Sequence, residues 1–104
     1  MSNKQFESQG QAETALIEKL REPQKARVIL LNDDYTSMEF VVRILMEVFR
    51  KTYREAEDIM WNVHEQGRGV CGVYPIEIAE TKVTVVHARA KAEGFPLRCA
   101  VEPV

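Results

Sequence analysis

The sequence lacks any apolar run near the ~18 residues that a membrane-spanning helix requires. Residues 1–11 contain no hydrophobic stretch of the kind that a secretory signal needs. Excess charge is also small, because 14 lysines and arginines balance 16 aspartates and glutamates to leave a net charge of -2. No broad basic surface is therefore expected to neutralise phosphates. We expect a cytoplasmic protein with no membrane and no nucleic acid among its partners.

Cysteine is scarce, and the two cysteines present do not form a Cys-x-x-Cys pair. Their separation argues against a redox motif or a structural zinc site, because both use closely spaced ligands. We expect Cys71 and Cys99 to be buried and reduced. The alternative is a zinc site that combines both thiols with His64 and His87. Our prediction is that the protein holds no metal and no other cofactor.

Apolar residues are also sparse in the first part of the chain, where a thin pattern ends at Pro23. An isolated helix at 13–20 would be marginal in water, so we expect residues 1–24 to form a flexible tail. The chain as a whole is 45% hydrophobic and 29% charged, which is typical of a soluble globular protein. At 104 residues it is long enough for one domain, which we place at 25–104.

The first strong apolar run predicts a strand at 27–31, because it is rich in β-formers and the segment 32–34 that follows is typical of a turn. Thr36 and Glu39 then match a capping box, so we expect Thr36 to cap a helix that extends to about Arg50. Apolar residues recur in this segment every three or four positions, as in a helix with one buried face.

A second capping box, formed by Thr52 and Glu55, predicts another helix from about Tyr53 to Gln66. A short strand at 70–74 follows it.

Pro75 and Gly94 mark the ends of a third helix, because Pro favours the first helical position and Gly favours the C-terminus. Its apolar face is expected to contain Ile78, Ala79, Val83, Val86 and Ala90. Alternation over 97–101 predicts a last strand with one buried face. The predicted fold class is α+β, a single small domain of order βααβαβ in which a three-stranded antiparallel sheet packs against three helices.

Met60, Val63 and His64 are expected to share one face of the second helix, because they stand at i, i+3 and i+4. They could meet the turn at 32–34, whose side-chain oxygens follow a strand. Together these residues predict an apolar hollow with an imidazole and several acceptors at its edge, which could surround a cation. Each pattern is also typical of ordinary structure, since such turns need no ligand and apolar residues at helical spacing usually form core.

Asp33, Asp34 and His64 raise the alternative of acid–base or metal-assisted hydrolysis. The sequence shows no positioned nucleophile, metal-ligand spacing or Gly-rich phosphate loop, so we predict no enzyme activity and no catalytic residues. A bare scaffold would explain the fold but not the acceptors beside an apolar face.

Several separated segments resemble one known family. The segment N-D-D-Y-T-x-M-E-F-V at 32–41 resembles the signature of the ClpS adaptors. Similar family segments recur at 63–64, 71–74, 79–83 and 96–99. The match spans Ala26 to about Glu102, and the family fold has the same βααβαβ order.

In this bacterial family the adaptor binds an N-degron, a protein whose first residue is Leu, Phe, Tyr or Trp. It delivers the N-degron to the ClpA unfoldase of the ClpAP protease and modulates ClpA substrate choice. The resemblance implies a site with Asn32, Asp33 and His64 at the α-amino group, Asp34 and Thr36 beside the first peptide unit, and Met38, Val41, Met60, Val63 and Leu97 around the side chain. It also implies that Met38 lies against the β-carbon and excludes branched residues.

The resemblance further implies that the chain is a monomer that docks on the N-terminal domain of a ClpA-type AAA+ unfoldase through Glu77 and Lys82. On sequence alone these two residues are ordinary solvated helix charges. Two positions depart from the family pattern. Ser37 stands where Pro is common, and Pro75 stands where Thr or Ser is frequent. We expect capping by Thr36 to preserve the geometry near Ser37.

Overall fold

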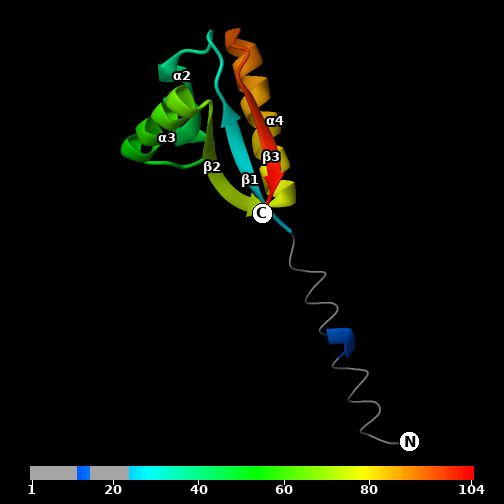
Figure 1. Cartoon of the computed structure of the whole chain (residues 1–104). Coiled ribbons are helices and arrows are strands. Elements are labelled where there is room, and N and C mark those ends of the chain that lie inside the picture. Colours follow the sequence, from blue (N-terminus) through cyan, green and yellow to red (C-terminus); the bar gives the residue numbers. More distant parts are fainter. Residues whose placement is uncertain (1–11, 15–23) are drawn as a thin grey trace, which may run out of the picture.

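The computed structural model describes residues 12–14 and 24–104, and the second range forms the small domain in Figure 1. Its elements are β1 (Lys25–Leu31), α2 (Met38–Glu47), α3 (Tyr53–Gln66), β2 (Arg68–Pro75), α4 (Ile76–Glu93) and β3 (Arg98–Pro103). Both neighbours of β1 are antiparallel to it, and the strand order is β2-β1-β3. The predicted α+β class and βααβαβ order are confirmed. The predicted tail lies outside the described residues, apart from a helical segment at 12–14 and Gln24.

The hydrophobic core lies between one face of the sheet and the three helices. Alternate residues of β1, namely Ala26, Val28 and Leu30, are completely buried and contribute the sheet side of this core. The helices add Phe40, Ile44, Leu45, Ala56, Met60, Val63, Ala79, Val86 and Ala90, all of them buried. Each large apolar side chain buried in this way stabilises the fold by about 1.5–3 kcal/mol. Within the described ranges, no helix is long and apolar enough to cross a membrane.

Both cysteines are buried and free, as predicted. Burial raises the pKa of the Cys71 thiol and of the Cys99 thiol to about 12, so both stay protonated. The zinc alternative is not assembled, because no cluster of three or more His, Cys, Asp or Glu side chains in the described residues could hold a metal ion. Instead, the Nε2 atom of His87 accepts a hydrogen bond of 3.0 Å from the backbone N–H of Cys99.

The prediction that Thr36 caps the first helix is wrong by one residue. Ser37 is the N-cap, and its hydroxyl accepts a 3.1 Å hydrogen bond from the backbone N–H of Phe40. The Thr36 hydroxyl instead donates to Asp33 at 2.7 Å, which holds it in the turn after β1. The local pattern matched a capping box, but the hydroxyl bonds to the preceding carboxylate and Ser37 caps the helix in its place. Ser37 therefore supplies the side-chain cap of α2.

The other helix boundaries are mostly as predicted. The Thr52 and Glu55 capping box is present at the start of α3. Helix α2 ends at Glu47 rather than near Arg50, whose φ of 57° takes the chain out of the helix. Gly94 ends α4 in the left-handed conformation, with a φ of 78°.

Three further predictions about α4 and its neighbour are corrected. Pro75 is the last residue of β2 and the N-cap of α4, so it precedes the helix rather than beginning it. The strand before it is also longer than the predicted 70–74. Ile78 is 48% exposed and does not belong to the core, although the other residues predicted for its helix face are buried or packed against the core.

Candidate functional site

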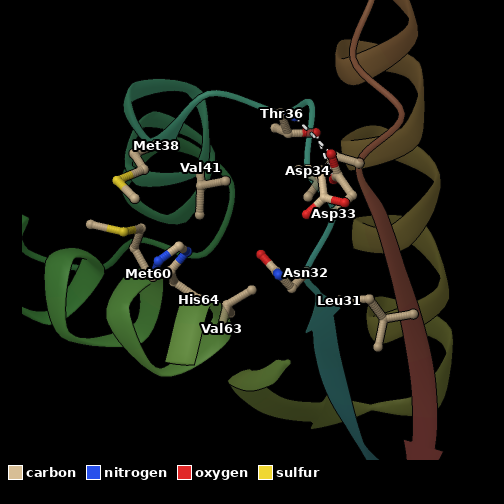
Figure 2. Close-up of a pocket in the computed structure, with 11 residues that line it drawn as sticks. Leu31, Asn32, Asp33, Asp34, Thr36, Met38, Val41, Met60, Val63 and His64 are labelled. Carbon is tan, nitrogen blue, oxygen red and sulfur yellow. Dashed lines mark hydrogen bonds between the residues drawn. The ribbon is translucent and has the colours of Figure 1, made fainter. Parts of the chain in front are cut away.

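A cavity of about 210 Å³, here called the β1 cavity, lies where β1 ends and faces α2 and α3. Its lining comprises Leu31, Asn32, Asp33, Asp34, Thr36, Met38, Val41, Met60, Val63, His64 and Leu97. Figure 2 shows the labelled side chains, which come from the end of β1, the turn after it, α2 and α3. The structure thus brings together every residue that the sequence analysis placed in the binding site.

Leu31 is the lining residue that the sequence analysis missed. It is the last residue of β1, and its neighbour Leu30 points into the core. Alternation along a strand therefore assigns Leu31 to the opposite face. The signal that could have found Leu31 is its position directly before Asn32. At the end of a strand, a side chain on the face opposite the core can contact the turn that follows.

Asp33 organises the turn after β1. Its Oδ1 accepts hydrogen bonds from the backbone N–H groups of Tyr35 at 2.8 Å and Thr36 at 2.7 Å, and its Oδ2 accepts one from the Thr36 hydroxyl. Burial alone raises the pKa of the Asp33 carboxyl, but these hydrogen bonds outweigh it and hold the pKa below its usual value. The carboxylate therefore stabilises the turn above the ordinary carboxyl pKa, and this contribution is lost as pH falls through the lowered pKa.

Asn32 connects this turn to the helix that carries His64. Its backbone N–H donates a 2.9 Å hydrogen bond to the carbonyl of Gly67, directly after α3. The next strand approaches α3 so closely that a Cβ on Gly69 would lie 2.8 Å from Val63 Cγ2. In Figure 2 the Asn32 amide and the His64 ring lie on opposite sides of the cavity. The close strand–helix contact therefore fixes how far apart these two polar groups stand.

The apolar wall has a buried part and an exposed rim. Val41, Met60, Val63 and Leu97 are each at most 7% exposed, so they form a wall that belongs to the core. Met38 is 44% exposed at the first position of α2 and forms the rim. The predicted i, i+3, i+4 face of Met60, Val63 and His64 therefore does meet the turn after β1, and the exposed His64 adds a polar edge.

Glu77 and Lys82 do not line the β1 cavity. Glu77 is exposed in the first turn of α4. Lys82 is not simply solvated, because its Nζ donates a 2.7 Å hydrogen bond to the carbonyl of Val48, the C-cap of α2. The same ammonium lies 5.8 Å from the Phe49 ring centre and 5.1 Å from that of Tyr74. Lys82 therefore joins α4 to the end of α2 through charge, which sequence patterning did not reveal.

The chemistry of the β1 cavity suits a small cation attached to an apolar group. Acceptors line it from both sides, Asn32 and Asp33 at the turn after β1 and His64 on α3, and the apolar side chains of α2 and α3 complete the lining.

Comparisons with known proteins identify the family of the chain. The family model described as "ATP-dependent Clp protease adaptor protein ClpS" matches residues 21–100. A ClpS adapter protein of Oleidesulfovibrio alaskensis is 57% identical over 104 residues, covering 100% of both chains. One from Wolinella succinogenes is 54% identical over 81 residues, covering 78% of this chain and 79% of the relative.

A solved structure, Agrobacterium tumefaciens ClpS2 bound to L-phenylalaninamide, has a TM-score of 0.77 and 40% identity. The alignment covers 80% of this chain and 100% of that one. The fold and the comparisons define a small adaptor domain. The chain belongs to the ClpS family of adaptors for the ATP-dependent Clp protease.

Proposed function

We propose that the β1 cavity binds the first residue of N-degron proteins that begin with Leu, Phe, Tyr or Trp, and that the protein delivers them to a ClpA-type unfoldase. The observation that carries this proposal is the meeting of Asn32, Asp33 and His64 with a buried apolar wall in one cavity. Phenylalaninamide, which is bound in the related ClpS2 structure, combines a free α-amino group with an aromatic side chain, so it presents the same two features.

Charge and hydrogen-bond capacity support this assignment. An α-amino group has a pKa of about 8 and is mostly cationic at neutral pH, so it needs several acceptors. A carboxylate offers about four acceptor positions, and Asp33 uses three of them within its own turn. One position on Oδ2 therefore remains for a ligand, beside the acceptors of Asn32 and His64.

The energies suit a reversible carrier. Burying a Phe-sized side chain contributes about 2–3 kcal/mol. Each charge-assisted hydrogen bond adds about 1.5–3 kcal/mol before ordering costs are subtracted. The balance corresponds to roughly micromolar or somewhat tighter binding, which permits release of the cargo.

A Phe-first peptide is expected to bind about 30–100-fold more tightly than an Ala-first peptide of otherwise identical sequence, because Ala leaves the apolar wall unfilled. Fluorescence anisotropy with a label at the peptide's C-terminus measures both affinities. A third peptide with Ala first and Phe at position five controls for apolar contact elsewhere. Equal affinities for the Phe-first and Ala-first peptides would contradict the proposal.

We infer that delivery uses docking on the N-terminal domain of the unfoldase, with Glu77 and Lys82 at the contact. Glu77 supports this role because it is an exposed charge in the first turn of α4, away from the cavity lining. In this proposal the protein acts as a non-enzymatic monomer in the bacterial cytoplasm. Its core domain at 25–104 holds the cargo, and the segment before it assists engagement of the unfoldase.

Replacing Glu77 with alanine is expected to slow degradation of a Phe-first substrate by the reconstituted protease, without changing peptide affinity or thermal stability. Lys82→Met should slow delivery and also lower the free energy of unfolding by about 1–2 kcal/mol, because the Val48 carbonyl loses its charged donor. Lys91→Met, at an exposed lysine of the same helix, is the matched control. If Glu77→Ala delivered the substrate at the wild-type rate, Glu77 would have no role in docking. If Lys82→Met were as stable as the wild type, the hydrogen bond from Lys82 to the Val48 carbonyl would not stabilise the fold.

A further inference from the structure

A second hollow adjoins the β1 cavity between α2 and α3. This α2–α3 groove has a volume of about 690 Å³ and is lined by Met38, Glu39, Val42, Arg43, Met46, Glu47, Tyr53, Glu57, Met60 and Trp61. Met38 and Met60 line both hollows, and they are the residues that the two linings share. The two methionines therefore stand as the partition between the cavity and the groove.

The groove has an apolar and aromatic lining that no described element covers. Met46, Tyr53 and Trp61 are 38%, 62% and 43% exposed, which is unusual for large apolar side chains that lie together. Glu39, Glu47 and Glu57 line it together with one cation, Arg43, and Glu47 is paired with Arg89 at 2.8 Å, so the lining keeps an excess of carboxylates. Such a groove suits a neutral aromatic ring and disfavours an anionic group.

The partition is made of the side chains best able to move. Methionine is unbranched, has three rotatable bonds and carries a polarizable sulfur that contacts aromatic rings favourably. Met60 is 7% exposed and forms the inner part of the partition, whereas Met38 is 44% exposed and forms the outer part. In Figure 2 both thioethers lie at the same end of the cavity, on the side of the two helices.

We propose that Met60 and Met38 close the β1 cavity against the α2–α3 groove, so that the groove takes the distal ring of an N-terminal aromatic residue longer than Trp only when this partition is shortened. Met60, together with Met38, then sets the upper size limit of the first residue. This inference rests on the proposed function, because it assigns the groove to the same ligand. Continuity through two shared residues identifies the occupant as the ligand's own side chain rather than a separate molecule.

The test compares peptides that begin with Phe and with 4-phenylphenylalanine, whose second ring extends the side chain. The wild-type chain is expected to bind the longer residue at least about tenfold more weakly than Phe, because the partition stays closed. Met60→Ala should reverse this order by opening the groove. Met38→Ala should do the same in part. Met38 is half exposed, so Met38→Ala is expected to remain folded. It therefore tests the proposal even if Met60→Ala unfolds.

Met46→Ala is the control within the groove. Met46 lines the groove but not the β1 cavity, so this change should leave Phe-first binding unaltered in every background. Combined with Met60→Ala, it should reduce the affinity gained by the longer residue. Thermal melts of each variant establish that it is folded before binding is measured.

The outcomes separate the two proposals. Failure of every chain to bind the Phe-first peptide would overturn the proposed function itself. Normal Phe-first binding with no gain for the longer residue in either Met60→Ala or Met38→Ala would overturn the partition proposal alone. A gain that Met46→Ala leaves intact would place the distal ring outside the groove and would overturn it as well.

Discussion

Acetylation of the α-amino group is expected to abolish the binding of a Phe-first peptide. An acetylated terminus is neutral and keeps one N–H donor, so the acceptors of Asn32, Asp33 and His64 lose most of their partners. Loss of two charge-assisted hydrogen bonds corresponds to about 3–6 kcal/mol, or at least a hundredfold in affinity. The apolar contacts of the Phe ring would remain but would not be sufficient.

Titration of the free and acetylated forms by anisotropy measures this effect directly. Asp33→Asn in the protein should weaken the binding of the peptide with the free α-amino group, because this change removes the negative charge that faces the ligand's cation. Glu39→Gln is the matched control, since Glu39 lines the α2–α3 groove and not the β1 cavity. If the free and acetylated peptides bound with the same affinity, the proposal that the protein recognises the α-amino group would be wrong.

Met38→Ala is expected to let Ile-first and Val-first peptides bind. Leu, Phe, Tyr and Trp all carry a CH₂ at the β-position, whereas Ile and Val place a second branch there. In the proposed arrangement this branch collides with Met38 on the cavity rim, so exclusion is steric. Truncation removes the obstacle and costs the normal ligands at most about 1–2 kcal/mol of apolar contact.

Stability measurements separate this role from simple packing. A buried core methionine would cost about 2–5 kcal/mol on truncation to alanine. Met38 is 44% exposed, so its truncation should change the free energy of unfolding much less. Met46→Ala, on the same helix and 38% exposed, should affect stability similarly without admitting branched residues. If Met38→Ala binds Phe-first peptides but still rejects Ile-first and Val-first ones, Met38 is not the gate.

Local patterns predicted the elements well where local chemistry decides the structure. The Thr52 and Glu55 pair caps α3 because all of its partners lie within one helical turn. Thr36 is not the cap, because its hydroxyl is held by Asp33 in the turn after β1 and the next residue, Ser37, accepts from the helix N-terminus. The capping-box pattern compares a residue only with the residues that follow it, so it does not include the hydrogen bond between Thr36 and the preceding Asp33.

The lining of the β1 cavity was predictable from residue spacing in part. The family resemblance placed the other predicted residues there, namely Thr36, Met38, Val41 and Leu97. The turn at 32–34 and the face that carries Met60 and His64 are both visible in the sequence. The position of Lys82 was not, because its bond to Val48 joins two helices that are distant in the chain. Helical periodicity places a residue on a face of its own helix but does not identify the partner across that face.

The antiparallel pairing of β1 and β3 gives the domain two functionally different ends. Ala26 pairs with Pro103, and the backbone N–H of Val104 donates to the carbonyl of Lys25, so the last residue lies beside the point where the chain enters β1 (Figure 1). The turn of the β1 cavity begins at the other end of this strand, about 20 Å away at ~3.3 Å per residue. If the domain were attached to a surface through Val104, the opening of the β1 cavity would therefore lie at the end of the domain that is distant from the surface.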